Sequence, residues 1–239
     1  SKITVGGIKN YGFVVSNSAH SSKFDSATVD NLLYSVDKTK HGIGKNAGTI
    51  DVTGKESVGF VLIKGGHSEN SGKILVSGNA TDSIGFYGEE DQLTNQASGE
   101  ISVTSAGEKN KGVVLNGKNT ANVHFINAGK IITGNSIKGK EKVGVYAQGK
   151  YKFEHNTGAN MEVGSNNIGF YVKDNTGTVT IKAPIVLSKS DGGTSIGVYS
   201  DGEAKVNFGE NSKLEIGEGA VGLYSSEASK FNNTFNFES

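Results

Sequence analysis

Histidine is the side chain whose placement would most readily reveal a metal site or a proton-transfer site in this chain. His67 and His124 each lie five residues before a glycine of a recurring phrase, with one further repeat between them. Equivalent positions in two repeats with one repeat between them are about 10 Å apart, and side chains at that distance are too far apart to share a metal ion. His20, His41 and His155 stand in polar segments typical of turns. We therefore expect exposed loop histidines, with no metal and no cofactor bound.

Carboxylate groups are the second candidates, because glycoside hydrolysis uses two of them about 5–9.5 Å apart. The one dense acidic group, Glu89-Glu90-Asp91, is typical of a solvated turn, and the aspartates elsewhere are scattered. The chain has no cysteine, which excludes a thiolate nucleophile and Cys-bound zinc. It also has no arginine, so the bidentate clamp for phosphate or carboxylate is absent. We therefore predict that the chain is not an enzyme.

Tyrosine recurs two residues after a glycine, in a phrase of the form apolar-Gly-apolar-Tyr. Strand alternation puts this position on an outer face, where rings from successive repeats would form a ladder. Such a stripe can stack on sugars or anchor a protein partner; alternatively, the rings stabilise the sheet or lie beneath a loop or another domain. The candidate ligand-binding residues are Tyr87, Tyr146, Tyr171, Tyr199 and Tyr224.

An internal repeat defines the elements that carry these side chains. The glycine phrase occupies residues 11–14, 58–61, 84–87, 111–114, 143–146, 168–171, 196–199 and 221–224. From Gly59 onward its glycines are 26, 27, 32, 25, 28 and 25 residues apart. The 47 residues from Gly12 to Gly59 leave room for one more degenerate copy, for which Asn31-Leu32-Leu33-Tyr34 is the candidate.

A second phrase, Gly-x-Ile-x-Val, precedes the glycine phrase, most clearly at residues 48–52, 72–76 and 99–103. Period-2 alternation predicts that its Ile and Val point inward together. In the glycine phrase, we expect the two residues flanking Gly to point inward, with Gly and Tyr outward. An asparagine that can stack its amide into a ladder stands two residues before the glycine of the second phrase or a looser copy of it, at Asn46, Asn70, Asn127 and Asn156.

A repeat of about 26 residues with two or three short strands cannot bury its apolar face alone, but stacked repeats bury it continuously. The pattern predicts an all-β fold, a single-stranded right-handed parallel β-helix of about eight or nine coils of roughly 26 residues. No stretch has the 3.6-residue periodicity of a helix. The structural alternative is a Greek-key sandwich, which does not explain one phrase recurring at a single spacing.

Charge and composition limit the partners. The chain has 24 Lys and 24 Asp+Glu without a basic block, which argues against nucleic acid or an anionic membrane surface as the main partner. No apolar run approaches the roughly 18 residues of a membrane span. The start of the chain has no signal-peptide pattern. We expect residues 1–239 to form one solenoid segment of a longer protein.

The order N-x-G-x-I-x-V followed by [I/V]-G-[V/F]-Y, seen in residues 46–60, 70–87, 127–146 and 156–171, resembles the passenger domains of type V autotransporters. The likeness is greatest to the very large adhesins of fusobacteria. The resemblance implies a β-helical stalk on the bacterial surface, anchored to the outer membrane through a C-terminal translocator barrel that this chain does not contain. It assigns no catalytic or ligand-binding residue.

The resemblance therefore implies an extracellular adhesin segment that attaches to a protein or glycan on host cells or on other bacteria. Two alternatives stay open. One is a β-helical enzyme that degrades polysaccharide, which requires carboxylates on adjacent coils. The other is a spacer or toxin-like passenger stalk, in which this segment has no ligand of its own.

Overall fold

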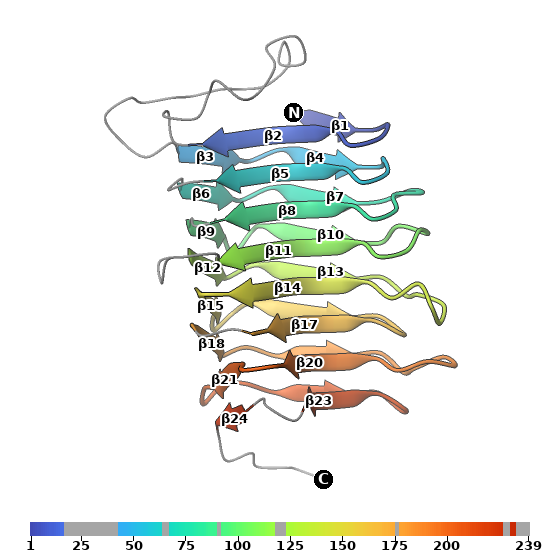
Figure 1. Cartoon of the computed structure of the whole chain (residues 1–239), viewed down its shortest axis with the longest axis vertical. Helices are drawn as coiled ribbons and strands as arrows, with labels where there is room; N and C mark the ends of the chain where they lie inside the picture. The colour runs from blue at the N-terminus through green and yellow to red at the C-terminus, as the bar shows by residue number, and fades with distance from the viewer. Residues whose placement is uncertain are drawn as a thin grey trace.

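The computed structural model describes residues 1–16, 43–63, 67–89, 92–117, 123–174, 177–226 and 230–232. Within these ranges the regular structure consists of β-strands, stacked in layers along one axis (Figure 1). No helix in these ranges is long and apolar enough to cross a membrane.

The strands form three sheets of eight strands each. The first sheet contains β1 (Lys2–Val5), β4 (Thr49–Val52), β7 (Lys73–Val76), β10 (Glu100–Val103), β13 (Lys130–Thr133), β16 (Asn160–Val163), β19 (Ile185–Leu187) and β22 (Leu214–Ile216). The second sheet contains β2 (Tyr11–Ser16), β5 (Val58–Ile63), β8 (Ile84–Glu89), β11 (Lys111–Gly117), β14 (Val143–Gly149), β17 (Ile168–Lys173), β20 (Ile196–Asp201) and β23 (Val221–Ser225). The third sheet contains β3 (Ile43–Asn46), β6 (His67–Asn70), β9 (Gln92–Asn95), β12 (Val123–Asn127), β15 (Tyr151–His155), β18 (Thr178–Ile181), β21 (Lys205–Phe208) and β24 (Lys230–Asn232).

Each strand pairs in parallel with the strand three places later, so three successive strands make one coil of a solenoid. Ile101, for example, lies beside Ile74 of the coil before and Ile131 of the coil after. The first sheet runs behind the second and in the opposite direction as the chain descends (Figure 1), which gives the right-handed winding that parallel crossovers prefer. The predicted parallel β-helix is confirmed, and a Greek-key sandwich is excluded because its strands would pair antiparallel.

The number of coils differs slightly from the prediction. β2 pairs directly with β5, with Phe13 beside Phe60, and β1 pairs directly with β4. No coil therefore lies between them, and the upper estimate of nine coils is wrong. The candidate copy Asn31-Leu32-Leu33-Tyr34 lies outside the described residues.

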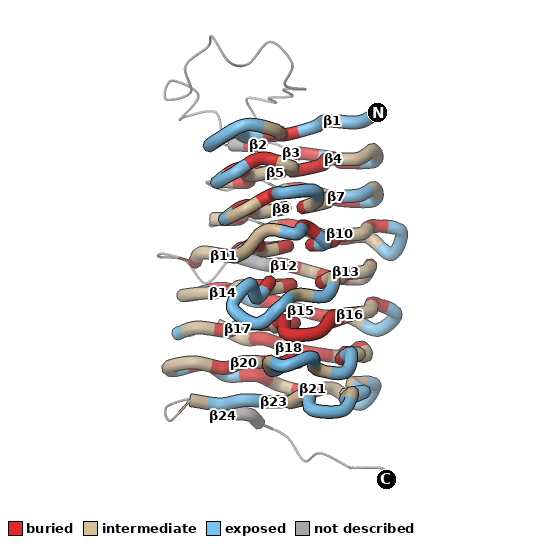
Figure 2. The backbone as a smooth tube through the Cα atoms, turned by 90° about the vertical axis from the view of Figure 1, so that its right-hand side faces the viewer, coloured by how far each residue is buried: buried red, intermediate tan, exposed pale blue. Residues whose placement is uncertain are grey.

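The core lies inside the three sheets and runs the length of the solenoid. The inward residues of the second phrase are fully buried or nearly so, as predicted, from Ile50 and Val52 to Ile185 and Leu187, whereas in the last coil Ile216 is 50% exposed. Buried residues recur along the strands of successive coils in Figure 2. Aromatic rings pack edge to face within the same column: Phe13 and Phe60 have ring centroids 4.8 Å apart, and Phe60 and Phe86 5.4 Å. Each coil buries its apolar residues against both neighbours, which is why one repeat alone would not fold.

The repeated glycine does not point outward as the alternation predicts. A Cβ built on Gly85 would meet core atoms of Ile74 and Val76, and it would lie 2.7 Å from the carbonyl oxygen of Gly112 in the next coil. Phe86, the next residue, is also buried, whereas Ile84 before the glycine is partly exposed. The expectation that both flanking residues point inward is therefore wrong. Glycine is needed here because adjacent coils approach too closely for any side chain, and the strand loses its alternation at that point.

Candidate functional site: the outer face of the second sheet

Three rows of side chains run along the outer face of the second sheet, one residue from each coil. The pre-glycine row consists of Tyr11, Val58, Ile84, Lys111, Val143, Ile168, Ile196 and Val221. The tyrosine row consists of Val14, Val61, Tyr87, Val114, Tyr146, Tyr171, Tyr199 and Tyr224. The polar row includes Glu89, Asn116, Gln148, Lys173 and Asp201, four residues after each glycine.

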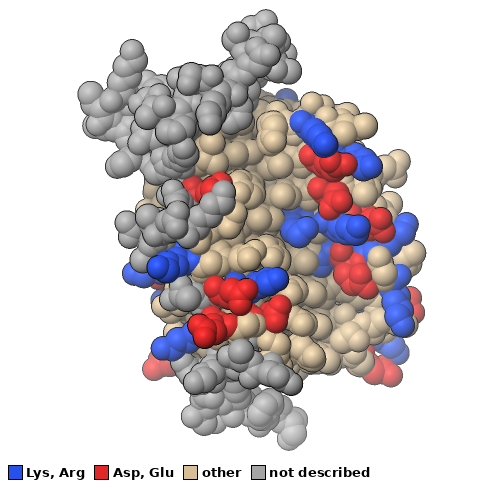
Figure 3. Space-filling view, in the orientation of Figure 1, with Lys and Arg blue, Asp and Glu red and all other residues tan. Residues whose placement is uncertain are grey.

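This face is poor in charge along its centre. Lys111 is the one charged residue of the pre-glycine and tyrosine rows, and its Nζ donates a hydrogen bond to the carbonyl oxygen of Lys109, 3.2 Å away in the preceding turn. In Figure 3 the charged side chains gather mainly toward the margins, and uncharged atoms cover much of the middle. An outer sheet face normally carries polar residues. This face is therefore the most unusual surface among the described residues.

The predicted ladder of four tyrosines is present. The ring centroids of Tyr146 and Tyr171 are 5.2 Å apart, those of Tyr171 and Tyr199 4.7 Å, and those of Tyr199 and Tyr224 4.8 Å. The last two pairs are nearly parallel, with interplanar angles of 18° and 19°. Tyr87 is in the same row, but Val114 lies between it and Tyr146.

The stacking limits what the ladder can bind. Parallel rings less than about 5 Å apart cover one another's faces, so a sugar cannot lie flat on the rings inside the stack. Tyr146 and Tyr224, at the two ends of the ladder, each have one ring face that no tyrosine of the ladder covers, and Tyr224 is 47% exposed. The inner rings present their edges and hydroxyl groups. The predicted stacking on sugar faces is therefore restricted to the two ends of the ladder, whereas contact with a protein surface is compatible with the whole row.

Hydrogen bonds to the polar row orient the hydroxyl groups. Tyr146 donates to Oε1 of Gln148 at 3.1 Å, and Tyr171 donates to Oδ2 of Asp201 in the next coil at 3.1 Å. Burial raises the pKa of Tyr171, and the hydrogen bond to Asp201 raises it further, because ionisation would bring two anions together. Burial also raises the pKa of Tyr146. These phenols stay protonated at neutral pH, so the ladder is an uncharged surface and offers no general base.

An amide ladder runs along the end of the third sheet, inside the solenoid. Asn46 donates from Nδ2 to Oδ1 of Asn70, Asn70 to Asn95, and Asn95 to Asn127, each at 2.7 Å. The predicted ladder is correct for three of its members, but Asn95 was missed and Asn156 is not a rung. The distance from an asparagine to the next glycine does not identify the rungs of the ladder. The better signal is strand alternation, because each rung stands two residues after another buried residue of the same strand, as Asn95 does after Leu93.

His155 takes the next place in this ladder and is fully buried, so its predicted exposure is wrong. Its Nδ1 lies 2.9 Å from Nδ2 of Asn127, and its Nε2 lies 3.2 Å from the carbonyl oxygen of Pro184. The Nδ2 group of Asn127 can only donate and the carbonyl oxygen of Pro184 can only accept, so the neutral tautomer of His155 with hydrogen on Nε2 satisfies both. Burial lowers the pKa of His155 to about 4. His155 therefore has a structural role: its Nδ1 accepts the hydrogen bond from Asn127, the last amide of the ladder.

The other candidates for chemistry stay apart. His67 in β6 and His124 in β12 both pair with Gln92 of β9, which lies between them in the sheet. One coil therefore separates the two histidines, as predicted. His20 and His41 lie outside the described residues. Glu89 ends β8, and Glu90 and Asp91 are outside the described residues. Among the residues described, no group of three His, Asp or Glu side chains is placed to hold a metal ion.

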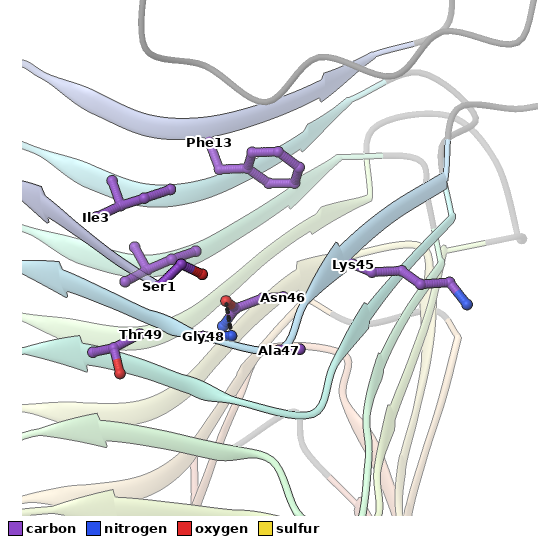
Figure 4. Close-up of a pocket in the computed structure, with 9 residues that line it drawn as sticks. Ser1, Ile3, Phe13, Lys45, Asn46, Ala47, Gly48 and Thr49 are labelled. Atoms are coloured by element: carbon purple, nitrogen blue, oxygen red, sulfur yellow. Dashed lines mark hydrogen bonds between the residues drawn. The ribbon is translucent and has the colours of Figure 1, made fainter.

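A hollow of about 180 Å³ lies at the N-terminal end of the solenoid (Figure 4). Its lining includes the core residues Ile3, Phe13 and Ile50 together with Asn46, the first rung of the amide ladder, and contains no acidic residue. The side chain of Lys45 extends away from it (Figure 4). The hollow is the open end of the core, and it has no pair of groups that could transfer a proton to a substrate.

Comparison with family models, with curated proteins and with solved structures finds no match to this chain. The outer face of the second sheet therefore has to be interpreted from its own geometry.

Proposed function

We propose that this chain is a stalk segment of an extracellular bacterial adhesin, the passenger of a type V autotransporter, held at the outer membrane by a translocator barrel elsewhere in the protein. In this proposal it attaches the cell to a protein or glycan on host cells or on other bacteria, without catalysis and without a cofactor. The attachment surface is the outer face of the second sheet. The observation that carries the proposal is the continuous tyrosine row, which contains no Lys, Asp or Glu and ends in four stacked tyrosines.

Physical chemistry supports the choice of this face. An exposed apolar strip is costly in a soluble protein unless something covers it part of the time. Tyrosine is enriched in protein interfaces because it offers a large rigid surface with few rotatable bonds. The edges of the stacked rings and the hydroxyl oxygens favour a protein partner over a glycan.

The test is binding of the purified chain to host cells, to bacteria and to a glycan array. The double variant Tyr171→Ser and Tyr199→Ser is expected to abolish binding while the fold is retained, as judged by circular dichroism and thermal unfolding. The matched control replaces two outer residues of the first sheet, Ile132→Ser and Val186→Ser, which lie in two of the coils that carry the tyrosine row. Equal binding by both double variants would show that attachment does not use the tyrosine row.

A spacer is the second candidate, because the rings stack on one another and two of their hydroxyl groups bond within the solenoid. In that role the tyrosine row stabilises the stack of coils, and the unaltered chain binds none of the cells or glycans. The remaining alternative, a polysaccharide-degrading enzyme, predicts turnover of a glycan on the same array.

A further inference from the structure

We propose that the partner of the outer face of the second sheet is a second copy of this chain, packed face to face with its solenoid axis antiparallel. The proposal rests on the attachment function only in taking this face as the binding surface. It follows from the size of the face, from the order of large and small residues along it, and from the positions of its charges.

The face is large enough for a stable dimer. Its strands are mostly six residues long, which is about 20 Å at 3.3 Å per residue. Eight coils about 4.8 Å apart extend about 38 Å. The face therefore covers about 750 Å² per copy, or about 1,500 Å² in the pair, and stable interfaces bury about 1,200–2,000 Å².

The tyrosine row opposes a large side chain to a small one at three of the four coil pairs when it faces its own reverse, and the remaining pair is Tyr87 with Tyr171. A two-fold axis parallel to the strands, between β11 and β14, places the first coil opposite the eighth and the fourth opposite the fifth. Val114 then faces Tyr146 of the other copy, and Val61 faces Tyr199. Val61 and Val114 are 6% and 8% exposed, so each sets a short side chain opposite the ring that it faces.

The same axis brings one pair of opposite charges together. Glu89 in the third coil faces Lys173 in the sixth coil of the other copy, and the reverse pair forms on the other side of the axis. Two charged residues face aliphatic ones, since Lys111 faces Val143 and Asp201 faces Ile63. Packing with parallel axes would instead set the polar row against the pre-glycine row and place Glu89, Lys173 and Asp201 on the isoleucines of their own coils. That arrangement desolvates more charged groups without a partner, so the antiparallel arrangement is favoured.

Cysteine cross-linking tests the register directly, because the chain has no cysteine of its own. Val114→Cys and Tyr146→Cys are made as separate single variants and mixed under mild oxidation. The antiparallel register predicts a disulfide between the two variants. A mixture of Val114→Cys and Tyr224→Cys, which lie in coils that do not face one another, is the matched control. Equal cross-linking in both mixtures, or in neither, would overturn the register.

Charge reversal tests the contact by a second route. Glu89→Lys or Lys173→Glu alone brings like charges together and is expected to weaken the dimer by about tenfold or more. The double variant restores opposite charges and is expected to recover association. Sedimentation equilibrium measures the dimer constant, and thermal unfolding of each variant shows that the fold is kept.

The outcomes separate this proposal from the attachment function. A chain that stays monomeric at its highest soluble concentration, but binds cells through the tyrosine row, overturns the second-copy proposal and leaves the attachment function standing. A chain that dimerises in the predicted register but binds no cell and no bacterium supports this proposal against the attachment function.

Discussion

The outer face of the second sheet differs from the outer faces of the other two sheets, although the strands of all three repeat in the same coils. On the first sheet Lys130 pairs with Glu162 at 2.7 Å, and on the third Lys45 pairs with Glu69 at 3.2 Å. The second sheet instead stacks tyrosines along its centre. Charged pairs on outer strands are the usual surface of a solenoid, whereas stacked rings beside an aliphatic row are not.

The difference shows which rows the fold requires. All three sheets turn a closely packed apolar face inward, as Ile74, Phe86 and Phe125 do in the first, second and third sheets. The inner rows therefore hold the coils together, and the outer rows can vary without loss of the fold. The tyrosine row is consequently the part of the solenoid where stability and binding can both have shaped the sequence.

The largest expected effect comes from the inner rows. Ile101→Ala is expected to lower the free energy of unfolding by about 2–5 kcal/mol, because it leaves a cavity in a core that cannot fully close. Ser102→Ala, on the opposite side of the same strand, removes only a hydroxyl group from a residue that is 4% exposed, and it is expected to change the free energy of unfolding little. Urea unfolding of both variants measures the difference. Similar losses would contradict the inward and outward assignment.

Acid is expected to act through the buried ladder. Because the pKa of His155 is about 4 when folded and about 6.5 when unfolded, the unfolded chain binds the proton more tightly. Stability is complete above about pH 6.5 and falls as the pH drops toward about 4, with a total loss of about 3 kcal/mol. His155→Asn, which continues the amide ladder, is expected to remove this part of the pH dependence in thermal unfolding scans. An unchanged pH profile would show that other groups control the acid response.

The tyrosine row is expected to stabilise the second sheet measurably. Tyr199 stacks on two neighbours, and each aromatic pair contributes about 0.5–1.5 kcal/mol, so Tyr199→Ser is expected to cost about 1–3 kcal/mol. Tyr199→Phe keeps the rings and is the control, with a smaller loss. Chemical unfolding measures both. If the Ser variant is as stable as the original chain, the ladder contributes no stability, and its interpretation as a binding surface gains weight.

The smallest effect is expected on the first sheet. The Lys130 and Glu162 side chains are 43% and 41% exposed, and exposed ion pairs contribute about 0–1 kcal/mol. Lys130→Ala is therefore expected to change the free energy of unfolding by less than Tyr199→Ser does, and to have less effect as salt is added. A larger loss than that of Tyr199→Ser would remove the contrast between the two outer faces.

The sequence by itself determined the solenoid, the inner rows and the existence of the tyrosine row. A phrase that recurs every 25 to 28 residues over most of the chain must stack in register, because only then do the Ile and Val of each coil cover one another. These predictions needed no coordinates, since they depend on period-2 alternation and on repeat length.

Only the tertiary structure decided how the rows meet between coils. The inward direction of the repeated glycine, the mutual stacking of Tyr171 and Tyr199, and the burial of His155 all depend on the few ångströms that separate adjacent coils. At that distance the carbonyl oxygen of one coil excludes a side chain on the next, one ring covers another, and an amide needs an acceptor. The spacing of residues along the chain does not reveal these contacts, because each contact joins residues of two adjacent coils.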